Sequence, residues 1–423
     1  MVPVPLATPA AASFPPRLAF APEATLATLG FVLGGVALGT CSGLVPGLHA
    51  NNVALLLAAV AADVPGPPRL VGAAVLAAGV VHTFLDVVPA LALGVPDPAM
   101  AATALPGHRL VLEGRGREAV RLSALGSGLA VLLAVPLALP VTRGMVAVYP
   151  TLRAHLPLAL GIVALLLVAT ERGRLAMVGA AVGFALAATL GWATLDLDPS
   201  APLSVGGMLA PLFAGLFGAP VLVESMAGGG VPPQEDATVT LSGRSVAGLG
   251  FVGTTSGAVV GYVPGVSSAV AATVSLLAVP GRHGARGFLV TTSGVNTANT
   301  VFALFALVAL GSPRTGVLVA FERSGAPTDL VLLLPAVALA AVAGFCLVLL
   351  VGDRYLDVVG RLDNTRLAVG VLCLLGVVSL LFAGLTGVVA FAVASLVGLI
   401  PARFGARRVH LMGVLIGPLA LGL

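Results

Sequence analysis

A long apolar stretch of the chain contains two ionisable side chains, His82 and Asp86. Residues four apart share one face of a helix. His82 lies about 13 positions after Arg69, which is about 20 Å along a helix that rises about 1.5 Å per residue. A carboxylate at the centre of a bilayer costs about 2.5–3.5 kcal/mol on insertion scales, so such groups usually face a protein interior or an aqueous path. We interpret His82, Thr83 and Asp86 as ligands of a substrate or an ion; the alternative is a structural His82–Asp86 hydrogen bond that ties helices together.

A second polar cluster interrupts another apolar stretch, where residues 291–300 read T-T-S-G-V-N-T-A-N-T. Amide and hydroxyl groups can coordinate a cation through oxygen and can form hydrogen bonds with a carboxylate. We expect Asn296, Asn299 and Thr300 to contribute to the same kind of site. The alternative is a polar loop between two membrane spans.

The composition predicts the kind of protein that must position these groups. Of 423 residues, 58% are hydrophobic and 9% are charged, and the mean hydropathy is +1.10. Soluble domains carry about 25% charged residues, and β-barrels show short alternating segments instead of long apolar runs. We therefore predict an all-α integral membrane protein. The arginines are scattered among short loops and form no basic stripe, so no nucleic-acid binding is expected.

Apolar runs predict the membrane segments, because a helical span needs about 20 mostly apolar residues. Candidate spans lie at 24–45, 69–95, 121–142, 155–170, 174–195, 246–263, 285–311, 327–352, 366–383 and 384–401. Shorter apolar pieces, broken by Gly and Pro, lie at 49–62, 205–223, 266–280 and 409–423. We predict ten to thirteen membrane segments, including broken or re-entrant half-helices, after a Pro-rich N-terminal tail (residues 1–23).

An internal repeat organises these segments. G-T-C-S-G-L-V-P-G (39–47) and G-A-V-V-G-Y-V-P-G (257–265) both fit GxxxGxxPG, with an offset of 257 − 39 = 218 in the numbering. Gly94-Val95-Pro96 and Gly311-Ser312-Pro313 match with an offset of 311 − 94 = 217. We predict membrane repeat 1 at 24–200, a connecting segment at 201–245, and membrane repeat 2 with C-terminal helices at 246–423.

Loop charges suggest how the two copies are oriented. The span 69–95 precedes a basic loop at 109–121, whereas the matching span 285–311 follows a basic loop at 282–286. If both loops are cytoplasmic, as the positive-inside rule predicts, the matching spans run in opposite directions. The expected architecture is therefore two inverted-topology repeats, which is common among secondary transporters.

The GxxxGxxPG motifs predict a helix that breaks within the membrane. Proline removes a backbone donor and glycine permits a sharp turn, and the helix that starts after the break attracts anions. The alternative is that GxxxG only permits close helix packing and that the polar residues are ordinary caps. The binding interpretation assigns to the site Gly43, Pro46, Gly47, His49, Asn51 and Asn52 in the first copy, and Gly261, Pro264, Gly265, Ser267 and Ser268 in the second.

Two opposite charges occupy equivalent repeat positions. Asp97 and Arg314 differ in number by the repeat offset (314 − 97 = 217), and each follows a Gly-x-Pro. Such a pair could bind substrate or form an ion pair. Two loop charges in water are the alternative.

These motifs resemble a known family. The stretch Gly39–Gly47, the segment from Pro96 to Arg121, and Val295–Thr300 followed by Gly311-Ser312-Pro313 are similar to the large membrane subunit (permease) of the tripartite tricarboxylate transporters, the TctA-like proteins. The resemblance implies uptake of carboxylates driven by an ion gradient, with an extracytoplasmic binding protein and a small membrane subunit as partners. The chain departs from the family where His82, Thr83 and Asp86 stand in place of its usual Gly and Ser.

The leading hypothesis is a secondary transporter in the lipid bilayer of a prokaryotic cell membrane. We expect it to move small organic anions, mainly di- and tricarboxylates, coupled to Na⁺ or H⁺, with no cofactor and no bound metal. The alternatives are a lipid-linked phosphate translocase and an intramembrane hydrolase that uses His82 and Asp86. The sequence lacks HExxH and GxSxG, so an enzyme is not expected.

Overall fold

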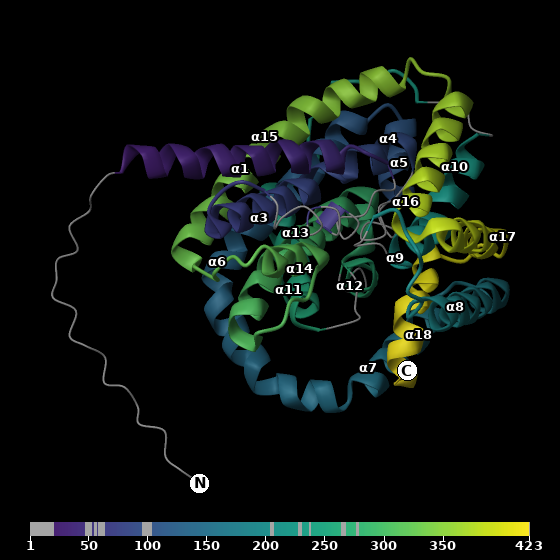
Figure 1. Cartoon of the computed structure of the whole chain (residues 1–423). Coiled ribbons are helices and arrows are strands. Elements are labelled where there is room, and N and C mark those ends of the chain that lie inside the picture. The colour runs from purple at the N-terminus through teal and green to yellow at the C-terminus, as the bar shows by residue number, and fades with distance from the viewer. Residues whose placement is uncertain are drawn as a thin grey trace, which may run out of the picture.

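The computed structural model describes residues 21–46, 53–54, 57, 64–94, 104–203, 207–226, 231–236, 238–263, 268–275 and 279–422. Within these ranges the chain is helical and contains no strand (Figure 1). Its α-helices are α1 (Pro22–Gly43), α3 (Pro68–Leu85), α4 (Val87–Leu93), α5 (Ala104–Leu112), α6 (Gly116–Ala154), α7 (Leu156–Ala169), α8 (Arg174–Thr194), α9 (Leu209–Phe213), α10 (Ala219–Ser225), α11 (Gly243–Tyr262), α12 (Ser268–Ser275), α13 (Gly284–Leu310), α14 (Gly316–Arg323), α15 (Leu330–Val359), α16 (Asn364–Gly398), α17 (Ile400–Arg403) and α18 (Gly413–Leu421). Three short helices of other types are η2 (Ala214–Gly218), η4 (Gly281–His283) and η5 (Arg408–Met412).

Seven helices in the described part of the chain are long and apolar enough to cross a membrane. They occupy Pro22–Gly43, Pro68–Leu93, Gly116–Ala154, Arg174–Thr194, Gly281–Leu310, Leu330–Val359 and Thr365–Arg403. The chain is therefore a multi-pass, all-helical membrane protein, as its composition predicts. The expected spans 366–383 and 384–401 meet within α16, where the backbone leaves helical geometry at Ala383 and Gly384 and two helices join. The expected boundary thus coincides with a kink.

Glycines bring two pairs of helices into backbone contact. On α1, Gly35 and Gly39 leave no room for a Cβ against the carbonyl oxygens of Ala74 and Ala78 on α3. On α11, the glycines at the equivalent positions (35 + 218 = 253; 39 + 218 = 257) do the same against α13. The partners there are Thr291 and Val295, each offset from its counterpart on α3 by 217 (291 − 74 = 217; 295 − 78 = 217). The two helix pairs therefore repeat each other contact by contact.

Both pairs are parallel, because the contacts advance in the same direction along the two helices. Gly43, in the last turn of α1, lies against the carbonyl of His82, and Gly261, in the last turn of α11, lies against the carbonyl of Asn299. α1 and α11 thus end beside the middle of the following span. Two helices that follow one another can run parallel only if the chain between them returns. Of the connection between α11 and α13, the structure describes the helix α12.

The two copies meet where α3 and α4 cross α13 in the opposite direction. Thr83 contacts Thr297, Asp86 contacts Asn296, and Gly107 of α5 lies against both Leu91 and Leu289. As residue numbers rise along α3 and α4 (83, 86, 91), they fall along α13 (297, 296, 289). The two helices are antiparallel at this crossing. The alternative of a polar loop at 291–300 is wrong, because these residues lie inside α13.

The described helices pack in two groups (Figure 1). We call the helices α1 to α6 and α11 to α15 the site body, and the helices α7 to α10 and α16 to α18, with η2 and η5, the support body. The main helix pairs of the site body are α11 with α13, α1 with α3 and α6 with α13, and those of the support body are α8 with α18 and α16 with η2 and α9.

Candidate functional site

The crossing of α3 and α13 holds two polar pairs that each join the two copies. The amide Nδ2 of Asn296 donates to Oδ2 of Asp86 at 2.7 Å. The hydroxyl oxygens of Thr83 and Thr297 are 3.1 Å apart. All four side chains are buried, and Asp86 and Asn296 are each 4% exposed. Polar groups in such surroundings must be hydrogen-bonded to offset their desolvation. Each hydrogen bond therefore holds a side chain of one copy against a side chain of the other.

Two further hydrogen bonds connect the crossing to α1 and α12. Ser42, in the last turn of α1, lies 3.0 Å from Nδ1 of His82. Asn299 donates through Nδ2 to the hydroxyl of Ser268, the first residue of α12, at 3.0 Å. His82 and Asn299 are equivalent positions of the repeat (299 − 82 = 217). In both copies, therefore, this position is hydrogen-bonded to a side chain from a neighbouring helix, α1 in the first copy and α12 in the second.

The chemistry of this cluster is that of a ligand site. It combines one carboxyl group, one imidazole, two amides and several hydroxyls near the middle of two membrane spans. Amides and hydroxyls both donate and accept hydrogen bonds, whereas a carboxylate only accepts and so also suits a cation. The cluster can therefore bind a hydrogen-bonding anion together with a small cation.

The structure brings together six of the residues predicted from sequence. His82, Asp86, Thr83, Asn296, Asn299 and Ser268 all belong to the hydrogen-bonded pairs. Thr300 lies on α13, directly after Asn299, and is 6% exposed. Gly43 and Gly261 stand in the last turns of α1 and α11, and Pro46 is buried just beyond α1.

The remaining predicted residues are not part of these pairs. Arg314 instead contacts Tyr149 near the C-terminal end of α6, where its Nη2 donates to the phenol oxygen at 2.6 Å and its guanidinium lies 5.0 Å from the ring centre. The other predicted residues lie outside the described residues: Gly47, His49, Asn51, Asn52, Asp97, Pro264, Gly265 and Ser267.

Sequence reasoning did not single out Ser42 and Thr297. Ser42 is inside the first GxxxGxxPG motif, but its repeat equivalent is Val260 (42 + 218 = 260), so the comparison of copies did not mark it. Thr297 belongs to the polar run at 291–300 and faces Thr83 only because α13 is a continuous helix. Interpreting residues 291–300 as a helix would have identified Thr297 as a site residue.

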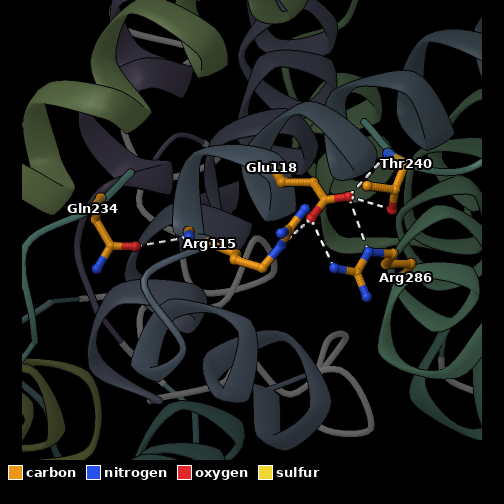
Figure 2. A network of polar contacts seen from close by, with 6 residues as sticks. Arg115, Glu118, Gln234, Thr240 and Arg286 are labelled. Atoms are coloured by element: carbon orange, nitrogen blue, oxygen red, sulfur yellow. Dashed lines mark hydrogen bonds and ion pairs between the residues drawn. The ribbon is translucent and has the colours of Figure 1, made fainter. Parts of the chain in front are cut away.

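A separate polar network ties the N-terminal ends of α6 and α13 together (Figure 2). Glu118 is fully buried and accepts hydrogen bonds from Arg115, from Arg286 and from both the backbone and the hydroxyl of Thr240. Gln234 accepts from the backbone of Gly116, which extends the network along the segment that leads to α11. Arg286 and Arg115 belong to the two basic loops, so the network shows that these loops lie at the same end of the site body.

Comparison with known proteins identifies the chain. Residues 29–413 match the tripartite tricarboxylate transporter TctA family. The chain belongs to the TctA family. It is also 27% identical, over 295 residues, to a protein of Methanocaldococcus jannaschii named "Uncharacterized protein MJ1079", and this alignment covers 68% of the present chain and 70% of the relative. No solved structure matches the chain.

Membership of the TctA family makes the chain a component of a transporter. The family is one of tripartite systems, which implies further subunits such as a binding protein and a small membrane subunit. A transporter family is consistent with a protein that is not an enzyme. The polar cluster at the α3–α13 crossing is thus the candidate transport site of a TctA protein.

Proposed function

We propose that this TctA protein is the permease that moves small organic anions, mainly di- and tricarboxylates, across a prokaryotic cell membrane, driven by a gradient of Na⁺ or H⁺. The pairing of Asp86 with Asn296, beside that of Thr83 with Thr297, carries the proposal. Intramembrane polar groups that face the interior of a bundle usually mark a substrate or ion path. A site that is shared by two copies of a repeat is the arrangement that secondary transporters use.

The contacts between helices support two inverted repeats. The glycine-packed pairs α1–α3 and α11–α13 match at constant offsets in the numbering, and α3 runs antiparallel to α13. Equivalent helices that run in opposite directions are what inverted repeats require. The Glu118 network supports the same proposal, because it brings both basic loops to one end, where the positive-inside rule places the cytoplasm.

Apolar helices support the proposed ten to thirteen membrane segments. Seven long helices and the shorter apolar helices Leu156–Ala169, Leu209–Ser225 and Arg408–Leu421 make ten, and the apolar pieces expected from sequence at 49–62 and 266–280 stay within the range. We propose that the predicted residues after each break complete the site with helix N-terminal amides. Those residues are His49, Asn51 and Asn52 in the first copy and Ser267 and Ser268 in the second.

The test is uptake by the purified protein in liposomes, with its partner subunits where these are found. We expect accumulation of labelled di- or tricarboxylates only when an inward Na⁺ or H⁺ gradient is applied. Each gradient is imposed alone, which identifies the coupling ion. Movement of a lipid-linked phosphate without carboxylate uptake would instead support the translocase alternative. Folded protein that moves no carboxylate under either gradient would contradict the proposal.

A further inference from the structure

The support body contains its own repeated helix pair, which the GxxxGxxPG motifs do not mark. Gly191 of α8 leaves no room for a Cβ against the carbonyl of Val414 on α18. Gly398 of α16 is equally close to the carbonyl of Leu216 in η2. The numbers of the two glycines differ by 207 (398 − 191), and those of their partners differ by 198 (414 − 216).

A second, reciprocal contact has the same offsets. Gly413, at the start of α18, lies against the carbonyl of Phe184 on α8, and Gly215 of η2 lies against the carbonyl of Phe391 on α16. The differences are again 198 (413 − 215) and 207 (391 − 184). The pair α8–α18 therefore repeats as α16–η2, and each pair takes one helix from each copy, because α8 and η2 form the first copy and α16 and α18 form the second.

Both bodies are consequently held together by close backbone contact. Small residues that allow helix backbones to touch are what stabilises helix association where the solvent is lipid. In the site body, such contacts join α1 to α3 and α11 to α13; in the support body, they join α8 to α18 and α16 to η2. Each body should therefore move as a unit, because tightly packed interiors do not deform continuously.

The boundary between the site body and the support body contains a cleft, in contrast to the close backbone contacts inside each body. A mostly apolar cleft of about 330 Å³ separates α7 of the support body from α11 and α12 of the site body. Its walls include Ala159 and Val163 on one side and Val263 and Val274 on the other. Elsewhere the bodies meet through apolar side chains, such as Val221 of α10, which belongs to the larger hydrophobic core. The hydrophobic effect is not directional, so apolar surfaces can stay in contact while one body shifts against the other.

The cleft also borders the half-helix that carries part of the site. α12 begins at Ser268, which holds Asn299, and the same helix packs against η5 of the support body. η5 is fixed in turn by buried polar contacts, because Glu171 accepts from Arg407 at 2.7 Å and lies 2.6 Å from His410. The support body therefore presents a firmly held surface to a helix that contributes to the site.

We propose that the site body moves as one unit against the support body during transport, and that the cleft between α7 and α11–α12 is the space that this movement opens and closes. The proposal rests on the proposed transport function. The polar pairs at the α3–α13 crossing all lie within the site body, so the bound ligand would travel with it. The rigid-body movement of one bundle against another is a general way to alternate access to a fixed site.

The test joins the two bodies covalently. The native cysteines, Cys41, Cys346 and Cys373, are first replaced by alanine, and uptake by this variant is measured. Ala159→Cys on α7 and Val274→Cys on α12 are then combined and linked across the cleft with a flexible bismaleimide. The matched control is Ala159→Cys with Val163→Cys, which places the same reagent in the same cleft but one helical turn apart on α7.

We expect the cross-cleft link to lower uptake by about tenfold or more, and the control link to leave it within about twofold, because only the first link stops the movement. Equal uptake by both linked proteins would overturn the proposal, and so would failure of the cross-cleft pair to link while the control pair links. Nitroxide labels at 159 and 274 give a readout that does not need uptake. Their separation should change when substrate and gradient are added, while labels at the exposed residues Leu132 of α6 and Val342 of α15, inside the site body, stay fixed. If the cysteine-free protein moves no carboxylate, the proposed function fails; if it transports but the 159–274 separation never changes, only the present inference fails.

Discussion

Replacing Glu118 by glutamine tests whether the network at the basic end of the site body stabilises the fold. Oε1 of Glu118 accepts from the backbone and hydroxyl of Thr240 and from Nε of Arg286, and a glutamine oxygen can keep these contacts. Oε2 accepts from Arg115 at 2.7 Å and from Nη2 of Arg286 at 3.0 Å. In Glu118→Gln this atom becomes an NH₂ group that faces two N–H donors.

The expected loss in the free energy of unfolding follows from the two hydrogen bonds that Glu118→Gln removes. Hydrogen bonds to charged groups contribute about 1.5–3 kcal/mol each, so the gross loss is roughly 3–6 kcal/mol. The side chains of Arg115 and Arg286 are 30% and 28% exposed, so water can solvate them in part once the carboxylate is gone. We therefore expect a net loss of about 2–4 kcal/mol in the free energy of unfolding, in the lower part of the range for broken buried pairs.

The assay is the midpoint of thermal unfolding in detergent, followed by size-exclusion chromatography of the heated protein. Glu113→Gln is the matched control, because Glu113 pairs with Arg109 and both side chains are largely exposed. Exposed i, i+4 pairs contribute about 0.3–0.5 kcal/mol, so this variant should melt almost as the wild type does. If Glu118→Gln and Glu113→Gln melt at the same temperature, the reasoning about the buried network is refuted.

Two further predictions follow from the glycine packing and from an ion-paired carboxylate. Gly257→Ala should lower the midpoint of thermal unfolding, because its Cβ clashes with the backbone of α13 at a cost of about 1–3 kcal/mol or more. Gly248→Ala, which has open space around it, should leave the midpoint unchanged or raise it. Equal midpoints for the two variants would disprove close α11–α13 packing. Burial raises the pKa of Glu171, but hydrogen bonds from Arg407 and His410 outweigh this and hold its pKa below the usual value. Its stabilisation should therefore be full above about pH 4.5, the usual glutamate value, and should disappear as the pH falls through the lower folded value. Thermal midpoints measured from pH 3 to 7 should show this acid loss in the wild type and a flatter profile in Glu171→Gln; identical profiles would argue against the ionised contact.

Much of the helical framework could be predicted, because membrane spans are long apolar runs that need little context. The expected span 285–311 corresponds to α13 (Gly284–Leu310), and the boundary between 383 and 384 coincides with the kink in α16. The GxxxG glycines Gly39 and Gly257 lie in backbone contact with α3 and α13, which is the packing role that the sequence offered as the alternative. These features depend on local composition and on short spacings.

Features that depend on partners far along the chain could not be predicted. Glu118 looks like an ordinary residue in a basic loop until Arg286 and Thr240 are brought to it by the fold. Gly191 and Gly398 end the same pattern, F-A-x-A-x-x-x-G (184–191 and 391–398), but their carbonyl partners lie far along the chain (414 − 191 = 223; 398 − 216 = 182), so the pattern alone does not show the contacts. The cluster of His82, Asp86, Asn296 and Asn299 was anticipated as a set of residues, whereas the pairing of each across the crossing required the structure.

The most direct test of the central claim, that the α3–α13 crossing is the transport site, is carboxylate uptake by Asp86→Asn in liposomes. This change keeps the size of the side chain and removes the charge that accepts from Asn296. Asp198→Asn removes the same charge from an exposed position after α8 and serves as the control. We expect Asp86→Asn to fold and melt like the wild type and to lose about 100-fold or more of the uptake rate, with Asp198→Asn within about twofold. Uptake by folded Asp86→Asn at the wild-type rate, under the same gradient, would contradict the account.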